Sequence, residues 1–506
     1  MHRRDFLMTA TATAALGLAA GAVQGQPVAP PTRFGFDEVV VLARGRAAAE
    51  YRQPLSTLAG AFKDLNYDQY RAIRFRRDLD PFSGDGATFG MDLLPPGLIF
   101  YEPVKISVVR NGQVQPISFS PQMLDFDDAL FPPELDRTAV GDMGWSGFRL
   151  RTTLNRPDVM DEFLVFQGAS YFRAVARDTL YGLSARGLAI RTGSPQGEEF
   201  PLFTDFWVHE PQAGEASITI HAILDSKSVA GAYEFVVTPG VETTFVTRIA
   251  LFPRVDLEGA GIAPLTSMFW FGPASPGVND YRPSVHDSDG LQMETGAGMH
   301  LWRLLGAHKT LQISGFVDSN PRGFGLVQRA RSFADYQDAE AGYHLRPSVW
   351  IEPSQAWGQG EVRLIEIPVE NEFNDNIVSY WTPAAPLAAG QQHDFGYRMT
   401  FGALPPERPL AAQVVQSRAG KSINGKGLTY IVDFELALFQ FGLPQWSVTA
   451  SSGTVGHSYV KALPDQNVLR LSFEYEPGNS QVAELTAVLN GNDGPLSETW
   501  MARWSR

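Results

Sequence analysis

Proline and glycine interrupt this chain from one end to the other, and this pattern restricts its fold more than any other feature. The 506 residues include 35 prolines and 48 glycines, with aromatic and β-branched runs between them. Such a texture is typical of many short strands joined by turns. The chain is also too long for one compact core, so we expect two or three domains of mainly β structure.

One segment departs from the β pattern. Residues 34–53, FGFDEVVVLARGRAAAEYRQ, predict a helix that Asp37 would cap. A shorter helical segment is expected within 324–337, and Asn111-Gly112 is a hairpin turn signal. The runs that predict strands include 70–75, 97–109, 203–209, 217–224, 233–238, 242–251, 300–303, 310–317, 363–369, 397–401, 430–436, 468–475 and 481–489.

Domain boundaries are expected where the composition changes. Residues 383–392, PAAPLAAGQQ, are the most linker-like segment after the N-terminus. The β-patterned residues that follow have the size, roughly a hundred residues, and the rhythm of an immunoglobulin-like sandwich. We therefore predict a signal peptide with a mature tail at 1–32, a large β domain at 33–385, a linker at 386–396 and an immunoglobulin-like domain at 397–506.

The N-terminus has the pattern of an export signal. Arg3-Arg4-Asp5-Phe6-Leu7 precedes the uncharged run TATATAALGLAAGA, which matches the twin-arginine pathway and predicts a periplasmic protein. The alternative is a cytoplasmic protein with a frayed start. The apolar run is too short and too rich in Ala, Gly and Thr to predict a membrane anchor.

Charge and cysteine content exclude several classes of function. Cysteine is absent, which excludes a disulfide framework, a thiol nucleophile and a cysteine metal site. A disulfide-free exported protein also suits the twin-arginine route, which carries folded cargo. The net charge of -14 argues against a nucleic-acid or anionic-membrane partner and is compatible with a neutral substrate.

Three common catalytic or cofactor motifs are missing. The chain has no Gly-x-Ser-x-Gly nucleophile elbow, since residues 144–147 have the wrong spacing. Residues 419–422, AGKS, resemble the end of a phosphate-binding loop, but Val415 stands where the first glycine belongs. The nine histidines show no paired ligand spacing, so neither a metal nor a cofactor is predicted.

A crowded set of carboxylates lies in residues 366–381, EIPVENEFNDNIVSYW. Glu370, Glu372 and Asp375 stand between two apolar runs and are followed by aromatics, including Trp381. Crowded carboxylates beside aromatic rings suit acid catalysis on a sugar. The alternative is a solvated turn, because the Asn and Asp residues around 375 are good turn formers.

A second acidic loop, HDSDG, spans residues 286–290. Asp287 and Asp289 could line a site with His286, or they could only hydrogen-bond the backbone of a turn. Aromatic rings stack on pyranose faces and arginine binds hydroxyls, so the aromatic-rich stretches of the chain could line a saccharide cleft. Any one tryptophan is more often part of the core than part of a binding surface. The further candidates for the cleft are Trp302, Tyr343, Arg346, Trp350, Trp357 and Trp381.

Five motifs occur in the order seen in one known family. The motifs are RPSVHDSDG at 282–290, LWR at 301–303, NPRGFG at 320–325, RPSVW at 346–350 and EFNDN at 372–376. Together they resemble the osmoregulated periplasmic glucan biosynthesis proteins G and D over essentially the whole mature chain, and the twin-arginine start is a D-type feature.

The resemblance implies a fold, an activity and catalytic roles. The fold is a large galactose-mutarotase-like β-sandwich followed by an immunoglobulin-like sandwich, which makes residues 33–385 the catalytic domain. The activity is endo-acting, anomer-inverting cleavage of β-1,2-glucan. Asp375 corresponds to the general acid with Glu372 beside it, and Asp287 corresponds to a base that acts on water through a relay including a substrate hydroxyl.

The residues agree with this chemistry. Inversion needs one protonated carboxyl group and one ionised carboxylate separated by roughly 6.5 to 9.5 Å, or further with a relay. Asp375 needs a raised pKa, which the like charges of Glu370 and Glu372, together with burial, would provide. Only the fold can bring Asp287 close to Asp375, because the two loops are far apart in sequence.

We therefore expect a periplasmic endo-β-1,2-glucanase that shapes osmoregulated glucans during their synthesis, with β-1,2-glucan as its partner molecule and no nucleic acid. One rival hypothesis is a non-catalytic glucan-binding scaffold for backbone synthesis or branching. Another is a transglycosylase. The immunoglobulin-like domain is a candidate contact for a membrane glucan synthase or for a second copy of the chain.

Overall fold

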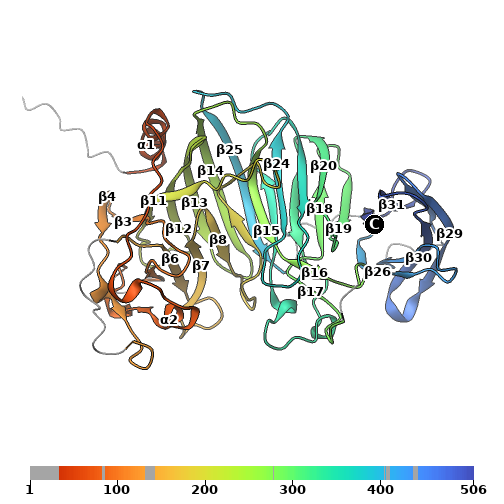
Figure 1. Cartoon of the computed structure of the whole chain (residues 1–506), viewed down its shortest axis with the longest axis horizontal. Coiled ribbons are helices and arrows are strands. Elements are labelled where there is room, and N and C mark those ends of the chain that lie inside the picture. The colour runs from red at the N-terminus through yellow and green to blue at the C-terminus, as the bar shows by residue number, and fades with distance from the viewer. Residues whose placement is uncertain are drawn as a thin grey trace, which may run out of the picture. The chain divides into compact units, whose positions relative to one another are not determined.

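The computed structural model describes residues 34–82, 86–131, 143–276, 279–403, 405, 411–436 and 443–506 (Figure 1). The twin-arginine pattern and the mature tail therefore lie outside the described residues. Residues Phe34–Arg506 form one compact unit. No helix among the described residues is long and apolar enough to span a membrane.

Two large sheets make up most of this unit. The first has ten strands, ordered β2-β6-β7-β8-β9-β15-β24-β23-β20, with β10 paired to β15. Its strands are β2 (Phe89–Leu94), β6 (Gly147–Thr152), β7 (Asp161–Gln167), β8 (Tyr171–Ala174), β9 (Ser184–Arg186), β10 (Leu188–Ile190), β15 (Ala260–Ser267), β20 (Gln312–Ser319), β23 (Gln359–Glu366) and β24 (Ile377–Pro383).

The second sheet has fourteen strands, ordered β28-β31-β32-β19-β18-β21-β22-β25-β14-β13-β12-β11-β3-β4. Its strands are β3 (Lys105–Arg110), β4 (Gln113–Ile117), β11 (Leu202–His209), β12 (Ile218–Asp225), β13 (Val229–Thr238), β14 (Thr243–Pro253), β18 (Gly290–Glu294), β19 (His300–Leu304), β21 (Gly323–Val327), β22 (Ser348–Pro353), β25 (His393–Gly402), β28 (Gln445–Ala450), β31 (Val482–Asn490) and β32 (Thr499–Ser505).

Smaller elements complete the unit. A four-stranded sheet contains β26 (Val414–Lys421), β27 (Leu428–Glu435), β29 (Thr454–Leu463) and β30 (Val468–Glu476). Two strand pairs are β1 (Arg74–Phe75) with β5 (Leu124–Asp125), and β16 (Phe269–Phe271) with β17 (Val285–His286). The helices are α1 (Phe36–Ala48), α2 (Tyr67–Ala72) and the 3-10 turns η1 (Gly60–Phe62), η2 (Arg77–Leu79), η3 (Pro121–Met123), η4 (Phe333–Asp335), η5 (Tyr343–Leu345) and η6 (Pro464–Gln466).

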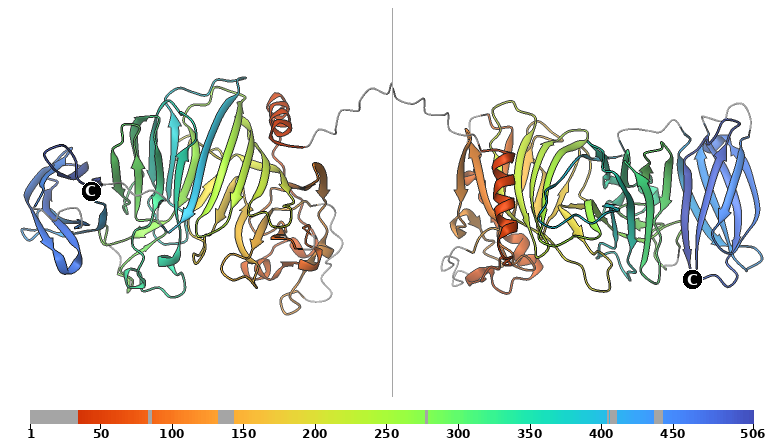
Figure 2. Two further views of the ribbon diagram at one scale, coloured as in Figure 1. Left: turned by 180° about the vertical axis from the view of Figure 1, so that it is seen from behind. Right: turned by 90° about the horizontal axis from the view of Figure 1, so that it is seen from above.

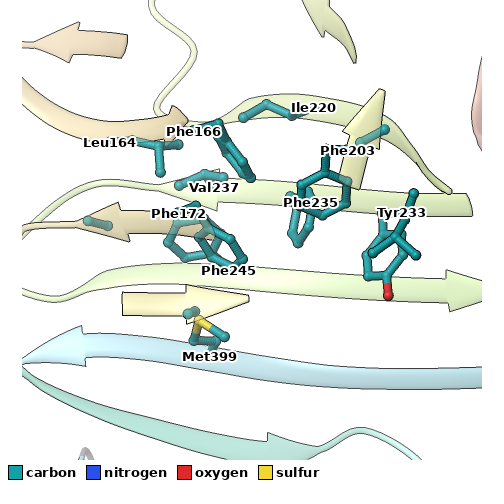
Figure 3. Close-up of a cluster of buried hydrophobic side chains, with 14 of the residues drawn as sticks. Leu164, Phe166, Phe172, Phe203, Ile220, Tyr233, Phe235, Val237, Phe245 and Met399 are labelled. Atoms are coloured by element: carbon teal, nitrogen blue, oxygen red, sulfur yellow. The ribbon is translucent and has the colours of Figure 1, made fainter. Parts of the chain in front are cut away.

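The two large sheets pack face to face through aromatic side chains (Figure 3). Phe166 of β7 lies 5.5 Å from Phe235 of β13, and Phe172 of β8 lies 5.6 Å from Phe245 of β14, measured between ring centroids. Burying each ring contributes about 1.5–3 kcal/mol relative to leaving it exposed. The prediction of a mainly β chain built as a β-sandwich is therefore confirmed.

The C-terminal strands form a second, smaller sandwich (Figure 2). Its core packs Val432 and Leu471 of the four-stranded sheet with Leu485 and Trp500 of the strands β31 and β32. Strand β32 also pairs in parallel with β19, with Trp302 opposite Trp500 in the register. The small sandwich is therefore continuous with the large sheet through backbone hydrogen bonds.

The predicted boundary at residues 386–397 needs correction. Strand β25 lies inside the fourteen-stranded sheet, between β14 and β22. Residues 386–396 therefore connect the two sheets of the large sandwich, from β24 to β25, and the small sandwich starts after Gly402. A surface connection within one domain can have the same composition as a linker between two domains. The alternating pattern of 397–401 also fits a strand in either domain. Neither feature could therefore indicate the sheet to which β25 belongs.

Helix α1 covers the outer face of the fourteen-stranded sheet (Figures 1 and 2). Val39 and Ala43 are fully buried there against Ala232 and Ala250. The predicted helix is confirmed, although it is shorter than 34–53, and its cap is different. Gly35 is the N-cap, and its N–H donates to the Glu38 carboxylate at 2.9 Å, so Asp37 lies in the first turn instead.

The helical segment expected within 324–337 is mostly absent. Residues 323–327 form β21, and helical structure in the described segment is limited to η4. A reason is visible at Gly325, where a β-carbon would lie 2.1 Å from the carbonyl oxygen of Val349 in the next strand. Close pairing of β21 with β22 requires glycine at this position.

Candidate active site

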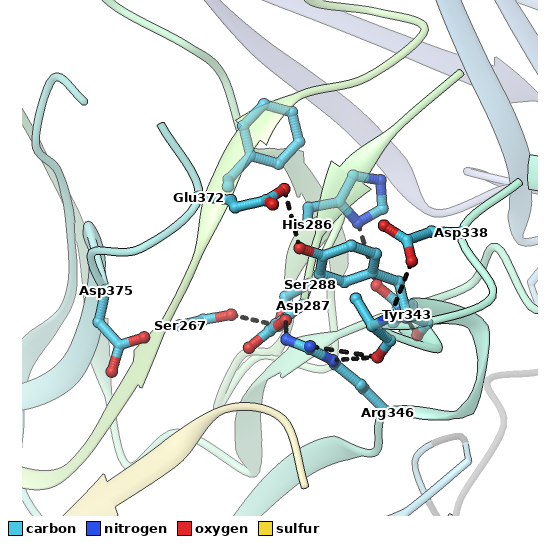
Figure 4. A network of polar contacts seen from close by, with 12 residues as sticks. Ser267, His286, Asp287, Ser288, Asp338, Tyr343, Arg346, Glu372 and Asp375 are labelled. Carbon is cyan, nitrogen blue, oxygen red and sulfur yellow. Dashed lines mark hydrogen bonds and ion pairs between the residues drawn. The ribbon is translucent and has the colours of Figure 1, made fainter. Parts of the chain in front are cut away.

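Two segments that are distant in sequence meet on either side of Ser267 and Met268. The N–H of Asp287 donates to the carbonyl of Met268 at 2.8 Å, and the N–H of Asn376 donates to the carbonyl of Ser267 at 3.0 Å. Because hydrogen-bonded strands lie about 4.8 Å apart, the backbones at 287 and 376 are separated by about 10 Å. The fold thus brings Asp287 and Asp375 into one site (Figure 4).

Asn376 closes the loop that carries Asp375. Its side-chain oxygen accepts the N–H of Phe269 at 2.8 Å, and its amide donates to the carbonyls of Phe269 and Ile367 at 3.0 and 2.9 Å. The residue is 2% exposed, and its side-chain donors and acceptor are all used. Sequence reasoning treated Asn376 only as a turn former, because nothing in the local pattern shows which distant carbonyls it meets.

Asp375 is partly accessible and lies beside arginine. Its side chain retains 31% of its surface, and Arg173 contacts its carboxylate at 3.3 Å. The Nε of Arg173 donates to Ser184 at 2.6 Å, which aims the guanidinium. Burial raises the pKa of Asp375, whereas Arg173, Arg186 and Arg346 lower it. The pKa of Asp375 is therefore raised by burial, which was one of the two predicted causes; the other predicted cause needs correction, because the charges that act most strongly are those of arginines and not of Glu370 or Glu372.

Asp287 is almost completely buried. It is 3% exposed, and the guanidinium of Arg346 contacts its carboxylate directly. Burial raises the pKa of Asp287, Arg346 opposes this effect, and the nearby charge of Asp375 raises the pKa further. The two aspartates are therefore electrostatically coupled, and each disfavours ionisation of the other.

Glu372 connects the surrounding loops. Its carboxylate accepts hydrogen bonds from Arg282 at 2.7 Å and from the Tyr343 hydroxyl at 3.1 Å. Arg282 also binds Asp338 at 2.9 Å, and the Tyr343 ring lies 4.3 Å below the guanidinium of Arg346. Burial raises the pKa of Tyr343, so its hydroxyl remains a donor. Figure 4 shows this network reaching Asp287 through Arg346.

The other polar residues of the HDSDG loop hold the loop in place. His286 is 2% exposed, stacks on Phe269 with 5.3 Å between ring centroids, and bonds Gln328 at 3.0 Å. Burial lowers the pKa of His286, which keeps the ring neutral. Asp289 accepts the backbone N–H groups of Arg329 and Ala330 at 3.1 Å. Both side chains are therefore engaged within the protein, and substrate binding by either of them stays a prediction.

The four predicted cleft tryptophans lie in the core. Trp302, Trp350, Trp357 and Trp381 are 2%, 5%, 6% and 0% exposed. Trp357 and Trp381 pack together with 6.2 Å between their ring centroids. The prediction that these rings line the cleft is therefore corrected: Trp357 and Trp381 pack in the core of the large sandwich, and Trp302 packs in the core of the small one.

A large open cleft of about 1880 Å³ lies beside Asp375, which forms part of its wall. Ligand pockets for small molecules usually measure about 300–1,000 Å³, so this cleft has the size required for a polymer. Its aromatic lining was missed in the sequence because these residues lie outside the acidic motifs. The lining includes Tyr51, Tyr67, Tyr70, Phe100, Tyr171, Tyr181 and Phe200.

The site contains side chains for proton transfer and saccharide contact, and no grouping typical of a metal centre. Among the residues that the structure describes, no three His, Asp or Glu side chains gather where they could hold a metal ion. A sandwich fold, an aromatic cleft large enough for a polymer and two neighbouring carboxylates are the features expected of a β-sandwich protein that binds or acts on a polysaccharide.

Comparison with known proteins identifies the family. The family model described as periplasmic glucan biosynthesis protein, MdoG, matches residues 34–504, and the chain belongs to this family. Glucans biosynthesis protein G of Rhodopseudomonas palustris (strain BisA53) is 44% identical over the full length of both chains. The proteins of the same name from Vibrio cholerae serotype O1 and Shewanella sp. (strain ANA-3) are each 42% identical over 93% of this chain and 87% of theirs.

These matches confirm the family predicted from the five motifs. The three relatives carry the G-type name, however, and the D-type assignment from the twin-arginine pattern stays a prediction.

Proposed function

We propose that this chain is a periplasmic glycoside hydrolase that cleaves β-1,2-glucan at internal linkages with inversion of the anomer. Its role would be in the biosynthesis of osmoregulated periplasmic glucans, as the family description and the relatives' names suggest. One observation carries the proposal: the fold brings Asp287 and Asp375 to opposite sides of Ser267 and Met268, with Asp375 in the wall of a polymer-sized cleft.

Asp375 is the proposed general acid. Its side chain is accessible from the cleft, and burial raises its pKa, as donation of a proton to a leaving glycosidic oxygen requires. Arg173 works against this role, because the ion pair favours the ionised carboxylate. A bound sugar would replace water around Asp375 and so favour its neutral form.

Asp287 is the proposed base, acting on water through a relay. Contact with Arg346 favours its ionised form, and its 3% exposure leaves little room for direct contact with a water molecule. Inversion uses a gap between the two carboxyl groups, and the two aspartates lie on segments that are hydrogen-bonded to opposite sides of Ser267 and Met268. Glu372 and Tyr343 then hold Arg346 and the adjoining loops in position.

Product analysis tests the proposal. The protein without its signal would be incubated with linear β-1,2-glucan, and oligosaccharide release and product anomer would be followed by NMR. Wild type should release α-anomers, whereas Asp375→Asn and Asp287→Asn should not. Binding of glucan without cleavage by the wild type would reject the hydrolase, and products longer than the input would indicate a transglycosylase.

A second candidate is a non-catalytic glucan-binding scaffold. The ion pairs of Asp375 with Arg173 and of Asp287 with Arg346 favour it, because a scaffold needs no protonated carboxyl group. Its partners would be the glucan and a membrane glucan synthase, or a second copy of the chain. In calorimetric titrations a scaffold would bind glucan equally well with either aspartate replaced, and no chain would be cut.

The proposed location also has a direct test. Replacing Arg3 and Arg4 by lysine should block twin-arginine export, so the precursor would accumulate in the cytoplasm in cell fractionation. Export of the doubly substituted protein at the normal rate would indicate a different route.

A further inference from the structure

Arg329 connects the HDSDG loop to the small C-terminal sandwich. Its backbone N–H donates to Asp289 at 3.1 Å. Its guanidinium donates to the carbonyl of Val414 at 2.8 Å, to Gln292 at 2.8 Å and to Glu498 at 3.0 Å. Val414 begins β26 and Glu498 immediately precedes β32, so one residue contacts both the loop and the sandwich.

Glu498 is a charged group with no access to solvent. Its side chain is 0% exposed, both of its oxygens contact the guanidinium of Arg329, and one also accepts the N–H of Val414 at 2.6 Å. The guanidinium carbon of Arg329 lies over the face of the Trp302 ring, 3.6 Å from the ring centroid. A buried charge is tolerated when it is paired and hydrogen-bonded, so the geometry of these groups is narrowly defined.

The HDSDG loop is held from two directions. On one side the hydroxyls of Ser288 and Ser267 bond at 2.9 Å, which ties the loop to the ten-stranded sheet. On the other side Asp289 accepts the N–H groups of Arg329 and Ala330. Asp287 precedes both contacts by one or two residues, so its position depends on each of them.

We propose that the Arg329–Glu498 pair is a positioning device through which the C-terminal sandwich holds the Asp287 loop in its working geometry. Neither residue touches the cleft, so both are positioning residues and not catalytic residues. The sandwich thereby has a function in the site, in addition to any contact with a partner. This inference rests on the proposed function for its catalytic consequence, but the loop geometry can be measured without it.

The test compares Glu498→Gln with a matched control. Glutamine keeps the shape of the side chain and removes its charge, which leaves Arg329 without its counter-ion. Asp433→Asn is the control, because Asp433 is 4% exposed and pairs with Arg470 at 2.7 Å inside the four-stranded sheet, away from the loop. Arg329→Lys is a second variant, which keeps the charge but cannot form the forked contact, for use if Glu498→Gln does not fold.

Two readouts are expected to respond to Glu498→Gln and not to Asp433→Asn. Amide hydrogen exchange should become faster in residues 285–290, and kcat on β-1,2-glucan should fall by about tenfold or more, because small misplacements of a catalytic group are costly. KM should stay within about twofold, since the cleft is unchanged.

The outcomes separate this inference from the proposed function. Unchanged exchange in 285–290, or the same change in both variants, would reject the positioning role even in an active hydrolase. Faster exchange in Glu498→Gln alone would support the positioning role. This would hold even if the wild type cleaved no glucan, in which case only the proposed function would fail. Faster exchange with normal kcat would reject the link between the sandwich and the chemistry.

Discussion

At the scale of single residues, two opposing influences act on the pKa of Asp375. Burial favours its protonated form, and the arginines around it favour the ionised form. An inverting acid must be protonated when substrate is bound and ionised after each turnover, so a carboxyl group between these influences is suited to the task.

The pKa of Asp375 has a consequence for stability. Because folding raises this pKa, the folded chain holds the proton more tightly than the unfolded chain, and stability falls as pH rises through the range between the two pKa values. Asp375→Asn should remove this loss. We expect the variant to have a higher Tm than wild type at neutral pH, with a difference that shrinks towards the ordinary pKa range of aspartate.

Calorimetric melts across the acidic range would measure this difference. The same variant should lose about 10²–10⁴-fold in kcat if Asp375 donates the proton. A lower Tm for Asp375→Asn at neutral pH would show that the ion pair with Arg173 outweighs the effect of burial.

Arg173 should control the pH range of activity. Arg173 lowers the pKa of Asp375, so Arg173→Met should raise that pKa and move the alkaline limb of the kcat/KM profile to higher pH. Arg77→Met is a matched control, because Arg77 lines the same cleft and pairs with Asp92 at 3.9 Å. A carboxyl titration by NMR gives the same information without activity, and an identical Asp375 titration in both variants would contradict the expectation.

At the scale of elements, the site depends on where strands end. Two successive carbonyls lie where β15 ends, those of Ser267 and Met268. The carbonyl of Met268 binds the HDSDG loop on one side, and that of Ser267 binds Asn376, just before β24, on the other. The two loops of the candidate site are therefore anchored by backbone pairing, and Asn376 reinforces the anchor with three side-chain hydrogen bonds.

A histidine pair, of which His221 is buried and His209 is partly buried, lies on β11 and β12 beside α1, far along the chain from the site loops. His209 bonds His221 at 2.9 Å, His221 bonds Glu234 at 2.9 Å, and Phe34 and Phe36 pack on His221. Burial and the neighbouring His221 lower the pKa of His209 to about 4. The folded chain therefore keeps His209 neutral over a range in which the unfolded chain binds a proton.

Stability should consequently fall as pH decreases from about 6.5, the ordinary pKa of histidine, to about 4, where the folded protein also binds the proton. His209→Gln should reduce this loss, which urea melts at several pH values would measure. His457→Gln is the control, because His457 is exposed on β29. Equal pH dependence in wild type and His209→Gln would show that another group is responsible.

At the scale of the whole molecule, the two sandwiches are joined by more than a linker. Strand β25 belongs to the middle of the large sheet, β32 extends that sheet by pairing with β19, and Arg329 binds Glu498 across the junction. These connections explain why residues 34–506 behave as one compact unit.

The position of β25 predicts how the chain can be divided. A chain ending at Gly396 should not fold, because its truncation interrupts the sheet between β14 and β22. A chain ending at Ala411 keeps β25 and should retain the β-sheet circular dichroism signal of the large sandwich. A soluble, cooperatively melting 34–396 fragment would contradict the sheet order.

The sequence by itself determined the class of structure and the family. Glycine and proline spacing with alternating apolar residues predicts many strands, and period-two patterns survive in any β context because they reflect only which face is buried. Short motifs such as HDSDG and EFNDN also identify the carboxylates of the candidate site, since they depend on the order of residues and not on their distances.

Only the tertiary structure decided which residues share the site. A single tryptophan is more often core than cleft, yet the aromatic-rich stretches made Trp357 and Trp381 cleft candidates, and the packing of the large sandwich places both in the core. Glu372 precedes Asp375 by only three residues, yet Arg282 and Tyr343 hold its carboxylate, while the arginines around Asp375 come from other strands and loops. Burial and long-range charge depend on strand order, which local sequence patterns do not encode, so these relations emerge only when the sheets are assembled.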